Sequence, residues 1–357
     1  MLLFRKSTLR TAASSLILGV AVVAAPVLAK PVYTSFDVAG AVGTYALGID
    51  RGGVVAGYYV DAQNAYHGFV RAADGTITTF DVSGAAATEP VGINKGGAVA
   101  GLYRDSAGVD HGFLRAAGGT ISTFDVKGAG SGFNEGTLAS GINTKNGIAG
   151  YDVDDNVVYH GYVRAKSGRI RRFDAPGAGA GPAQGTLAYA ISPDATITGY
   201  FIDSNSVLHG FVRASDGTLT QFDVSTAVGT SPYGINDTDS IAGSWFDAND
   251  VEHGFLRAPD GTISSFDAKG AGKSAFQGTF PVSINASGAI TGQTLDTNNV
   301  FHGFLRSGNG TLKVLDAPGA GSSQYQGTLA NSINDKGSIA GTYYDSNNVA
   351  HGFLRSQ

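Results

Sequence analysis

One unit of 44 or 49 residues is repeated along most of this chain, and this repeat constrains the fold more than any other feature. Each unit carries a His-Gly-Phe or His-Gly-Tyr tripeptide, and these tripeptides contain all seven histidines of the chain. A Phe-Asp or Leu-Asp pair follows each of the first six histidines by 13 residues, and all variation in length lies after that pair. The histidines are His67, His111, His160, His209, His253, His302 and His351.

Four short strands are expected in each unit, because turn-forming residues divide it at three regular places. An Asn-x-x-Gly sequence such as 94–97 comes first, an Asp-Asn-rich sequence such as 345–348 second, and a dipeptide such as Asp74-Gly75 third. The third type suits a two-residue hairpin turn, since both positions need a positive φ. Four antiparallel strands in each of seven units predict an all-β, seven-bladed β-propeller. A parallel β-helix is the alternative, but its coils are shorter and need fewer turns.

The two ends of the chain complement each other. Residues Val32–Val38 match the fourth strand of a unit, whereas the last unit ends after its third strand, His351–Arg355. The N-terminal strand is therefore predicted to supply the outer strand of the last blade and to close the ring, which removes two open edges. The register expected for the other units then places Phe36 opposite Phe353.

The Asp-Gly turn also predicts which residues face each other within a unit. A two-residue turn at 74–75 places Phe69 opposite Phe80 and directs His67 and Asp81 to opposite blade faces. We interpret the recurring His and Asp residues as structural, with any contact between blades, because seven identical active sites are implausible.

Residues 1–29 are typical of a signal peptide. Three basic residues precede a short apolar stretch at 16–27, and a Val-Leu-Ala sequence ends at Ala29. We expect cleavage after Ala29, which leaves residues 30–357 as a single domain in the periplasm or outside the cell. No later segment is apolar enough to span a membrane.

The composition excludes several classes of function. The chain has no cysteine, so disulfides, thiol catalysis and thiolate zinc sites are excluded. Its net charge is −5, whereas nucleic-acid-binding proteins usually carry an excess of basic residues. The sequence contains no Gly-x-Ser-x-Gly, His-Glu-x-x-His or phosphate-loop motif. We expect a monomer, and a binding protein is favoured over an enzyme.

The Gly-Ile-Asn, Ala-Gly-Tyr and His-Gly-Phe-Leu-Arg motifs resemble those of the probable extracellular repeat, HAF family, over residues 31–357. The family is named for a His-Ala-Phe-like motif, which stands here as His-Gly-Phe. The sequence departs from the pattern at Ile191-Ser192 and at Thr291-Gly292-Gln293. The resemblance implies export and a repeat architecture, but it implies no established reaction.

The loops of variable length and the Asp-Asn turns are expected on the same face of the propeller, where ligands bind. Trp245 replaces a Tyr or Phe of other units, either as a sugar-stacking platform or as a packed strand residue. Each long loop ends in a polar side chain that either lines the mouth of the channel or caps the loop. These residues are Glu135, Gln184, Gln277 and Gln326.

One turn is acidic enough to suggest a metal site. Asp152, Asp154 and Asn156 offer oxygen ligands of the kind that Ca²⁺ prefers. The turn lacks the glycine and the distal glutamate of an EF-hand loop, so a solvated hairpin turn is the alternative.

Two functions remain open. The first is a secreted, non-catalytic binding or scaffold protein that recognises a surface carbohydrate or another exported protein. The second is a hydrolase or lyase that acts on polysaccharide at the central mouth of the propeller. Glutamates are scarce, so such an enzyme would use an aspartate such as Asp154, alone or with Glu135.

Overall fold

The computed structural model describes residues 31–356, which contain 28 strands and no helix. They belong to one compact region, Pro31–Gln357. The predicted signal peptide, 1–29, lies outside the described residues. Within 31–356, no helix is long and apolar enough to cross a membrane.

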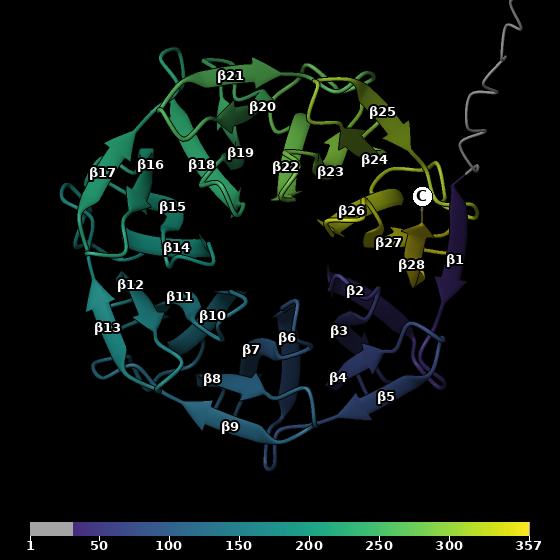
Figure 1. Cartoon of the computed structure of the whole chain (residues 1–357), viewed down its shortest axis with the longest axis horizontal. Helices are drawn as coiled ribbons and strands as arrows, with labels where there is room; N and C mark the ends of the chain where they lie inside the picture. Colours follow the sequence, from purple (N-terminus) through teal and green to yellow (C-terminus); the bar gives the residue numbers. More distant parts are fainter. Residues whose placement is uncertain (1–30, 357) are drawn as a thin grey trace, which may run out of the picture. The chain divides into compact units, whose positions relative to one another are not determined.

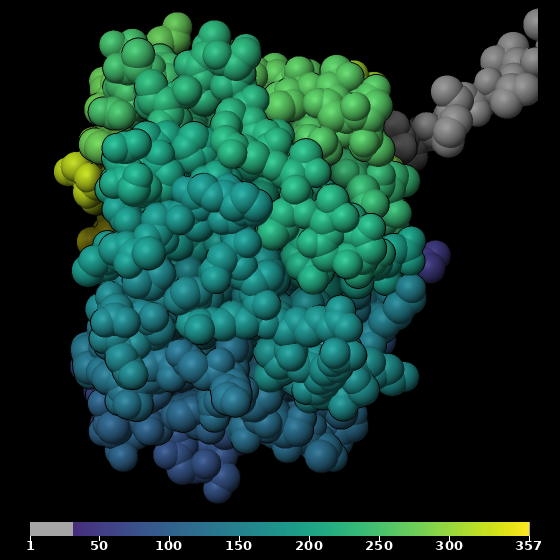
Figure 2. All heavy atoms as spheres, turned by 90° about the vertical axis from the view of Figure 1, so that its left-hand side faces the viewer, coloured from purple at the N-terminus to yellow at the C-terminus, as the bar shows by residue number. Residues whose placement is uncertain are grey.

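Consecutive strands pair antiparallel in sets of four, which we call units, and the units follow one another around a circle (Figure 1). The first strand of a unit lies toward the centre, and the fourth forms the rim, which Figure 2 shows from the side. The complete units are β2 (Gly43–Ile49), β3 (Val55–Val60), β4 (Tyr66–Arg71) and β5 (Ile77–Phe80); β6 (Ala87–Ile93), β7 (Val99–Arg104), β8 (Asp110–Arg115) and β9 (Ile121–Phe124); β10 (Gly136–Ile142), β11 (Ile148–Val153), β12 (Tyr159–Arg164) and β13 (Ile170–Phe173); β14 (Gly185–Ile191), β15 (Ile197–Ile202), β16 (Leu208–Arg213) and β17 (Leu219–Phe222); β18 (Gly229–Ile235), β19 (Ile241–Phe246), β20 (Glu252–Arg257) and β21 (Ile263–Phe266); and β22 (Gly278–Ile284), β23 (Ile290–Leu295), β24 (Phe301–Arg306) and β25 (Leu312–Leu315). The last unit consists of β26 (Gly327–Ile333), β27 (Ile339–Tyr344) and β28 (Ala350–Ser356), joined by β1 (Val32–Phe36) from the other end of the chain.

The recurring Asn and Asp residues shape the turns by accepting backbone hydrogen bonds. Asn94 Oδ1 accepts the N–H groups of the residues two and four positions later, between β6 and β7. Asp61 Oδ1 accepts the equivalent pair between β3 and β4. Such side chains replace backbone partners in tight turns, which explains why the turns recur at fixed spacing.

The predicted two-residue turn at 74–75 is wrong. The N–H of Ala72 donates to the carbonyl of Thr76 at 2.8 Å, so these two residues face each other and the loop between them has three residues, 73–75. Only the glycine of the Asp-Gly pair takes a positive φ, 96° at Gly75.

The longer turn shifts the pairing of β4 with β5 by one residue. Phe69 lies opposite Thr79, and Phe80 lies opposite Gly68, so the predicted Phe69–Phe80 pair is also wrong. A Cβ atom at Gly68 would lie 2.7 Å from the Phe80 ring, which explains why glycine follows the histidine.

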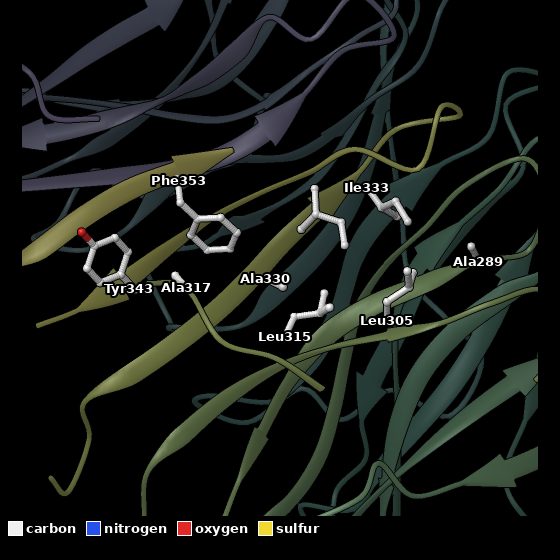
Figure 3. Close-up of a cluster of buried hydrophobic side chains, with 9 residues drawn as sticks. Ala289, Leu305, Leu315, Ala317, Ala330, Ile333, Tyr343 and Phe353 are labelled. Carbon is white, nitrogen blue, oxygen red and sulfur yellow. The ribbon is translucent and has the colours of Figure 1, made fainter. Parts of the chain in front are cut away.

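The aromatic rings meet across neighbouring units instead. The centroids of Phe80 and Phe113 lie 6.1 Å apart in an edge-to-face arrangement, and the Arg115 guanidinium lies 4.8 Å from the Phe80 centroid. The core is therefore a series of apolar clusters between units. In the cluster of Figure 3, Leu305 and Leu315 of one unit pack against residues of the last unit. The equivalent edge-to-face pairs at other junctions between units are Phe36–Phe69, Phe124–Tyr162, Phe173–Phe211, Phe222–Phe255 and Phe266–Phe304.

Strand β1 pairs antiparallel with β28, as the complementary ends of the sequence predict. Ser35 lies opposite Phe353, so the predicted Phe36–Phe353 pair is wrong by the same one-residue shift. The Phe36 ring contacts Phe69 of the next unit, with centroids 6.0 Å apart.

Hydrogen bonds also join the last unit to the first complete unit. The Asn334 side chain donates to the carbonyl of Asp50, and the Asn331 side chain donates to the carbonyl of Ala46, each at 2.9 Å. The strand pairings nevertheless form two separate sheets, one of 12 strands and one of 16.

Candidate functional site

Every histidine lies between two aspartates of its own unit. His67 Nδ1 is 3.0 Å from Asp81 Oδ1, and His67 Nε2 is 3.3 Å from Asp61 Oδ2. The predicted placement of His67 and Asp81 on opposite faces is wrong, because a shift of one residue turns a strand side chain to the other face. The same two contacts recur at His111, His160, His209, His253, His302 and His351.

Five of the histidine rings also stack on an aromatic ring from the second strand of the unit, as His67 does on Tyr59 with centroids 5.0 Å apart. Burial alone would lower the pKa of His67, but Asp81 and Asp61 raise it above its usual value. A contact that recurs in every unit holds the third strand to its neighbours. We therefore assign these groups to the scaffold.

Replacing His111 or His253 with alanine is expected to lower the free energy of unfolding by similar amounts, about 1–2 kcal/mol, because each change leaves two aspartates without their partner. Because the aspartates are partly exposed, the expected decrease in the free energy of unfolding lies at the lower end of the range for an unpaired buried polar group. Urea denaturation of both variants measures it. A variant that folds normally but loses ligand binding would assign its histidine to a functional site.

Trp245 is a packed strand residue in this structure. Its ring stacks on His253 with centroids 4.4 Å apart, and its side chain is half-buried. The indole N–H is buried without a hydrogen-bond partner among the described residues. This geometry favours the packed-residue alternative over a sugar platform.

The structure does not bring Asp152, Asp154 and Asn156 together. Asp152 is fully buried and accepts two hydrogen bonds from Arg172, at 2.6 and 3.0 Å. Asp154 Oδ1 instead accepts the N–H of Asn156, and its Oδ2 lies 3.5 Å from His160. No group of three or more His, Asp or Glu residues suited to a metal ion occurs within 31–356. The calcium site therefore stays a prediction, and the geometry favours a hairpin turn.

The polar residues at the ends of the long loops are bonded within the loops. Glu135, Gln184, Gln277 and Gln326 each accept the N–H of the residue three positions earlier. Gln277 also donates to the Asn299 side chain at 2.9 Å, which ties its loop to the following unit, β22 to β25. The structure thus favours the loop-cap alternative, and a direct role in ligand binding stays a prediction.

Exposed apolar side chains gather on the face that carries the Asp-Asn turns and the loops, short and long, that join consecutive units. Among the described residues, nine large apolar side chains are exposed, and seven of them lie in or beside these loops and turns. The other two, Val32 and Val314, lie on rim strands, and none lies at the Asn-x-x-Gly or Asp-Gly turns. The seven are Val42, Tyr66, Phe133, Val157, Val228, Phe276 and Tyr325. We call this side of the circle the loop face.

The three most exposed rings are held in long loops. Phe133, Phe276 and Tyr325 are 72%, 69% and 57% exposed. Phe276 and Tyr325 both have a positive φ, 63° and 60°, which is unfavourable for an aromatic residue. Backbone hydrogen bonds of 2.7 Å from each of these two residues to the preceding unit fix this conformation. The equivalent residues of the other two long loops, Asn134 and Ala183, have the same positive φ and the same backbone hydrogen bond, so this conformation belongs to the loop itself.

Sequence reasoning missed these aromatic residues because they do not recur in every unit. A usable signal was present, since Phe276 and Tyr325 precede the loop-end residues Gln277 and Gln326 by one position.

The opposite face is polar, and ion pairs cross its central opening. Lys95 Nζ lies 2.7 Å from Asp237 Oδ2 and 2.9 Å from Asp335 Oδ2, and the three residues come from three different units. Together with Arg51, they line a cavity of about 210 Å³. Burial would raise the pKa of Asp335, but Lys95 helps to lower it overall. Both carboxylates are paired with Lys95.

No protein-family model and no curated protein matches the chain. Among solved structures, the fold is similar to that of virginiamycin B lyase from Staphylococcus aureus, with a TM-score of 0.56 and 15% identity over 91% of this chain and 99% of that chain. A puromycin hydrolase mutant matches with a TM-score of 0.55 and 11% identity over 88% of this chain and 55% of that chain. Aleuria aurantia lectin, solved with alpha-methyl-L-fucoside, gives a TM-score of only 0.44 at 14% identity over 76% of this chain and 93% of that chain, too weak to support an argument.

These likenesses concern the fold alone. They show an all-β, repeated and propeller-like architecture over most of the chain.

Proposed function

We propose that this chain is an exported, non-catalytic carbohydrate-binding protein built on a closed seven-bladed β-propeller. The seven His-Gly-Phe-type units and the pairing of β1 with β28 support the blade count and the closure. The signal-peptide pattern at 1–29 and the resemblance to the HAF repeat family support export to the periplasm or beyond.

One observation carries the proposal: the exposed rings of Phe133, Phe276 and Tyr325 all lie on the loop face. Concentrated apolar exposure on one side of a protein marks an interaction site. The rings stand among Asp-Asn turns, whose carboxylates and amides offer hydrogen bonds. Flat apolar surfaces beside such polar groups match the alternating apolar faces and hydroxyl groups of sugars.

The polysaccharide hydrolase or lyase remains the second candidate. The central opening of the polar face does contain two carboxylates close together, because Asp237 and Asp335 both contact Lys95. A glycosidase needs one carboxyl group that stays protonated to act as the acid. Both carboxylates there pair with an ammonium group, which favours binding over hydrolysis.

The test replaces the two strained aromatic residues with glycine in one variant, Phe276→Gly with Tyr325→Gly. Glycine adopts a positive φ without strain, so the melting temperature should stay within a few degrees of wild type. Binding to the oligosaccharide that a glycan array selects should weaken by about tenfold for each stacking ring lost, since about 1.4 kcal/mol corresponds to tenfold.

Val314→Ala is the matched control, because Val314 is an exposed apolar residue on the rim. It should bind like wild type. Unchanged binding by the double glycine variant would refute the role of these rings. Release of reducing ends from a polysaccharide by the chain would favour the enzyme. If the immobilised chain retains another protein but binds no glycan, a protein partner would be favoured.

A further inference from the structure

A buried glutamate lies on the loop-face side of the unit that contains β18 to β21. Glu252 is the first residue of β20 and is only 6% exposed. Its Oε1 accepts a hydrogen bond of 2.5 Å from the Ser244 hydroxyl, and no cationic side chain among the described residues hydrogen-bonds to it. Burial raises the pKa of Glu252 to about 7, although the Ser244 hydrogen bond opposes the shift.

The other units provide internal controls for this position. Asp110 occupies it in the unit of β6 to β9, where Arg104 neutralises it with two hydrogen bonds of 2.8 and 3.1 Å. The unit of β10 to β13 has a buried aspartate at a different position, Asp152 on β11, and this carboxylate is likewise paired with an arginine, Arg172. The remaining units place an uncharged residue there: Tyr66, Tyr159, Leu208, Phe301 and Ala350. Glu252 therefore differs from its equivalents in being a buried acid without a cation.

Glu252 also lines a cavity. The cavity measures about 550 Å³ and lies between the 247–251 turn and the 270–273 segment of the long loop after β21. Two further acids line it, Asp247 and Asp267, but both contact His253, at 3.7 and 2.9 Å. The cavity wall also contains the titratable residues Asp247, His253, Asp267 and Lys273, and Tyr233 on β18 lies near the Glu252 carboxyl group.

An unpaired buried carboxylate is costly, and a protein keeps one where a ligand or a reaction uses it. The described part of the chain places no cationic side chain beside Glu252, and the cavity leaves space there for a cation from solution. We propose that this cavity binds the primary ammonium group of a small organic cation, with Glu252 as its counter-ion. Lys273 is exposed and is the only lysine among the described residues that line the cavity, so it is the internal competitor for Glu252.

Calorimetric titration of the full chain with butylamine at pH 8.5 tests the proposal, and 1-butanol serves as the neutral probe of similar size. Butylammonium should bind at least tenfold more tightly than butanol. Glu252→Gln should lose this preference, and binding should weaken at pH 5.5, where Glu252 is protonated. Glu89→Gln, which removes a partly buried acid of another unit, should bind like wild type.

Equal binding of the two probes, or an undiminished preference in Glu252→Gln, would overturn the proposal. Butylammonium binding that appears only in the Lys273→Met variant would also overturn the proposal, because Lys273 would then be the internal partner of Glu252. The inference stands apart from the proposed carbohydrate site. The Phe276→Gly, Tyr325→Gly variant should keep its affinity for butylammonium, and Glu252→Gln should keep its affinity for the glycan.

Discussion

Deletion of residues 31–38 is expected to abolish cooperative folding of the chain. The deletion removes β1 and exposes the edge of β28 over the whole length of its pairing. It also removes the buried Val38 and the half-buried rings of Tyr33 and Phe36 from clusters at the junction of the last and first units. These side chains contribute roughly 3–6 kcal/mol, at about 1.5–3 kcal/mol for a fully buried side chain. That loss is comparable with the stability of many whole domains.

Size-exclusion chromatography and thermal melting measure this result. The truncated chain should form oligomers or aggregates, because an open strand edge recruits another chain. A monomer with an unchanged melting temperature would contradict closure by β1. A cysteine pair at Thr34 and Leu354, which lie opposite each other, gives the positive control in a chain without other thiols. Oxidation should join positions 320 residues apart, giving a full-length product of higher gel mobility.

Glu252→Gln is expected to stabilise the protein at alkaline pH and to have little effect near pH 4.5. The pKa of Glu252 is about 7 in the folded chain against 4.5 ordinarily, so the folded state binds the extra proton between these values. The stability of the wild type therefore falls as the pH rises from about 4.5 to 7, and the full cost remains above pH 7. Because each pKa unit corresponds to 1.36 kcal/mol, this cost amounts to roughly 3 kcal/mol.

Urea denaturation of wild type and Glu252→Gln at several pH values measures the difference. The gain should grow through the range from pH 4.5 to 7 and then stay constant. A gain that is the same at pH 4.5 and pH 8 would show that the effect arises from packing rather than from ionisation. A destabilised variant at pH 8 would show that the carboxylate has a cationic partner in the folded chain.

The strand count and the order of the units follow from the sequence because turn-forming residues act locally. Asn94 and Asp61 shape their turns through bonds to residues two and four positions away, so their spacing predicts the strands directly. The register does not follow in the same way. An Asp74-Gly75 pair fits both a two-residue turn and the observed three-residue loop, and the Ala72–Thr76 hydrogen bond distinguishes them.

The candidate site is harder to predict because it consists of departures from the repeat. Trp245 stands out in the sequence, yet its neighbours in space are those of the equivalent tyrosines, so it packs on His253 as they do on theirs. Phe276 is an ordinary residue in the sequence, and only the loop backbone makes it exposed and strained. Glu252 likewise becomes unusual only through burial without a cation.

The most direct test of the proposed function is a crystal structure of residues 31–357 with the oligosaccharide that binds them most tightly on a glycan array. The proposal predicts density for sugar rings on the loop face, stacked on Phe276 or Tyr325 and hydrogen-bonded to the neighbouring Asp-Asn turns. Sugar bound instead in the central opening, beside Asp237 and Asp335, would contradict the proposal and support the hydrolase or lyase.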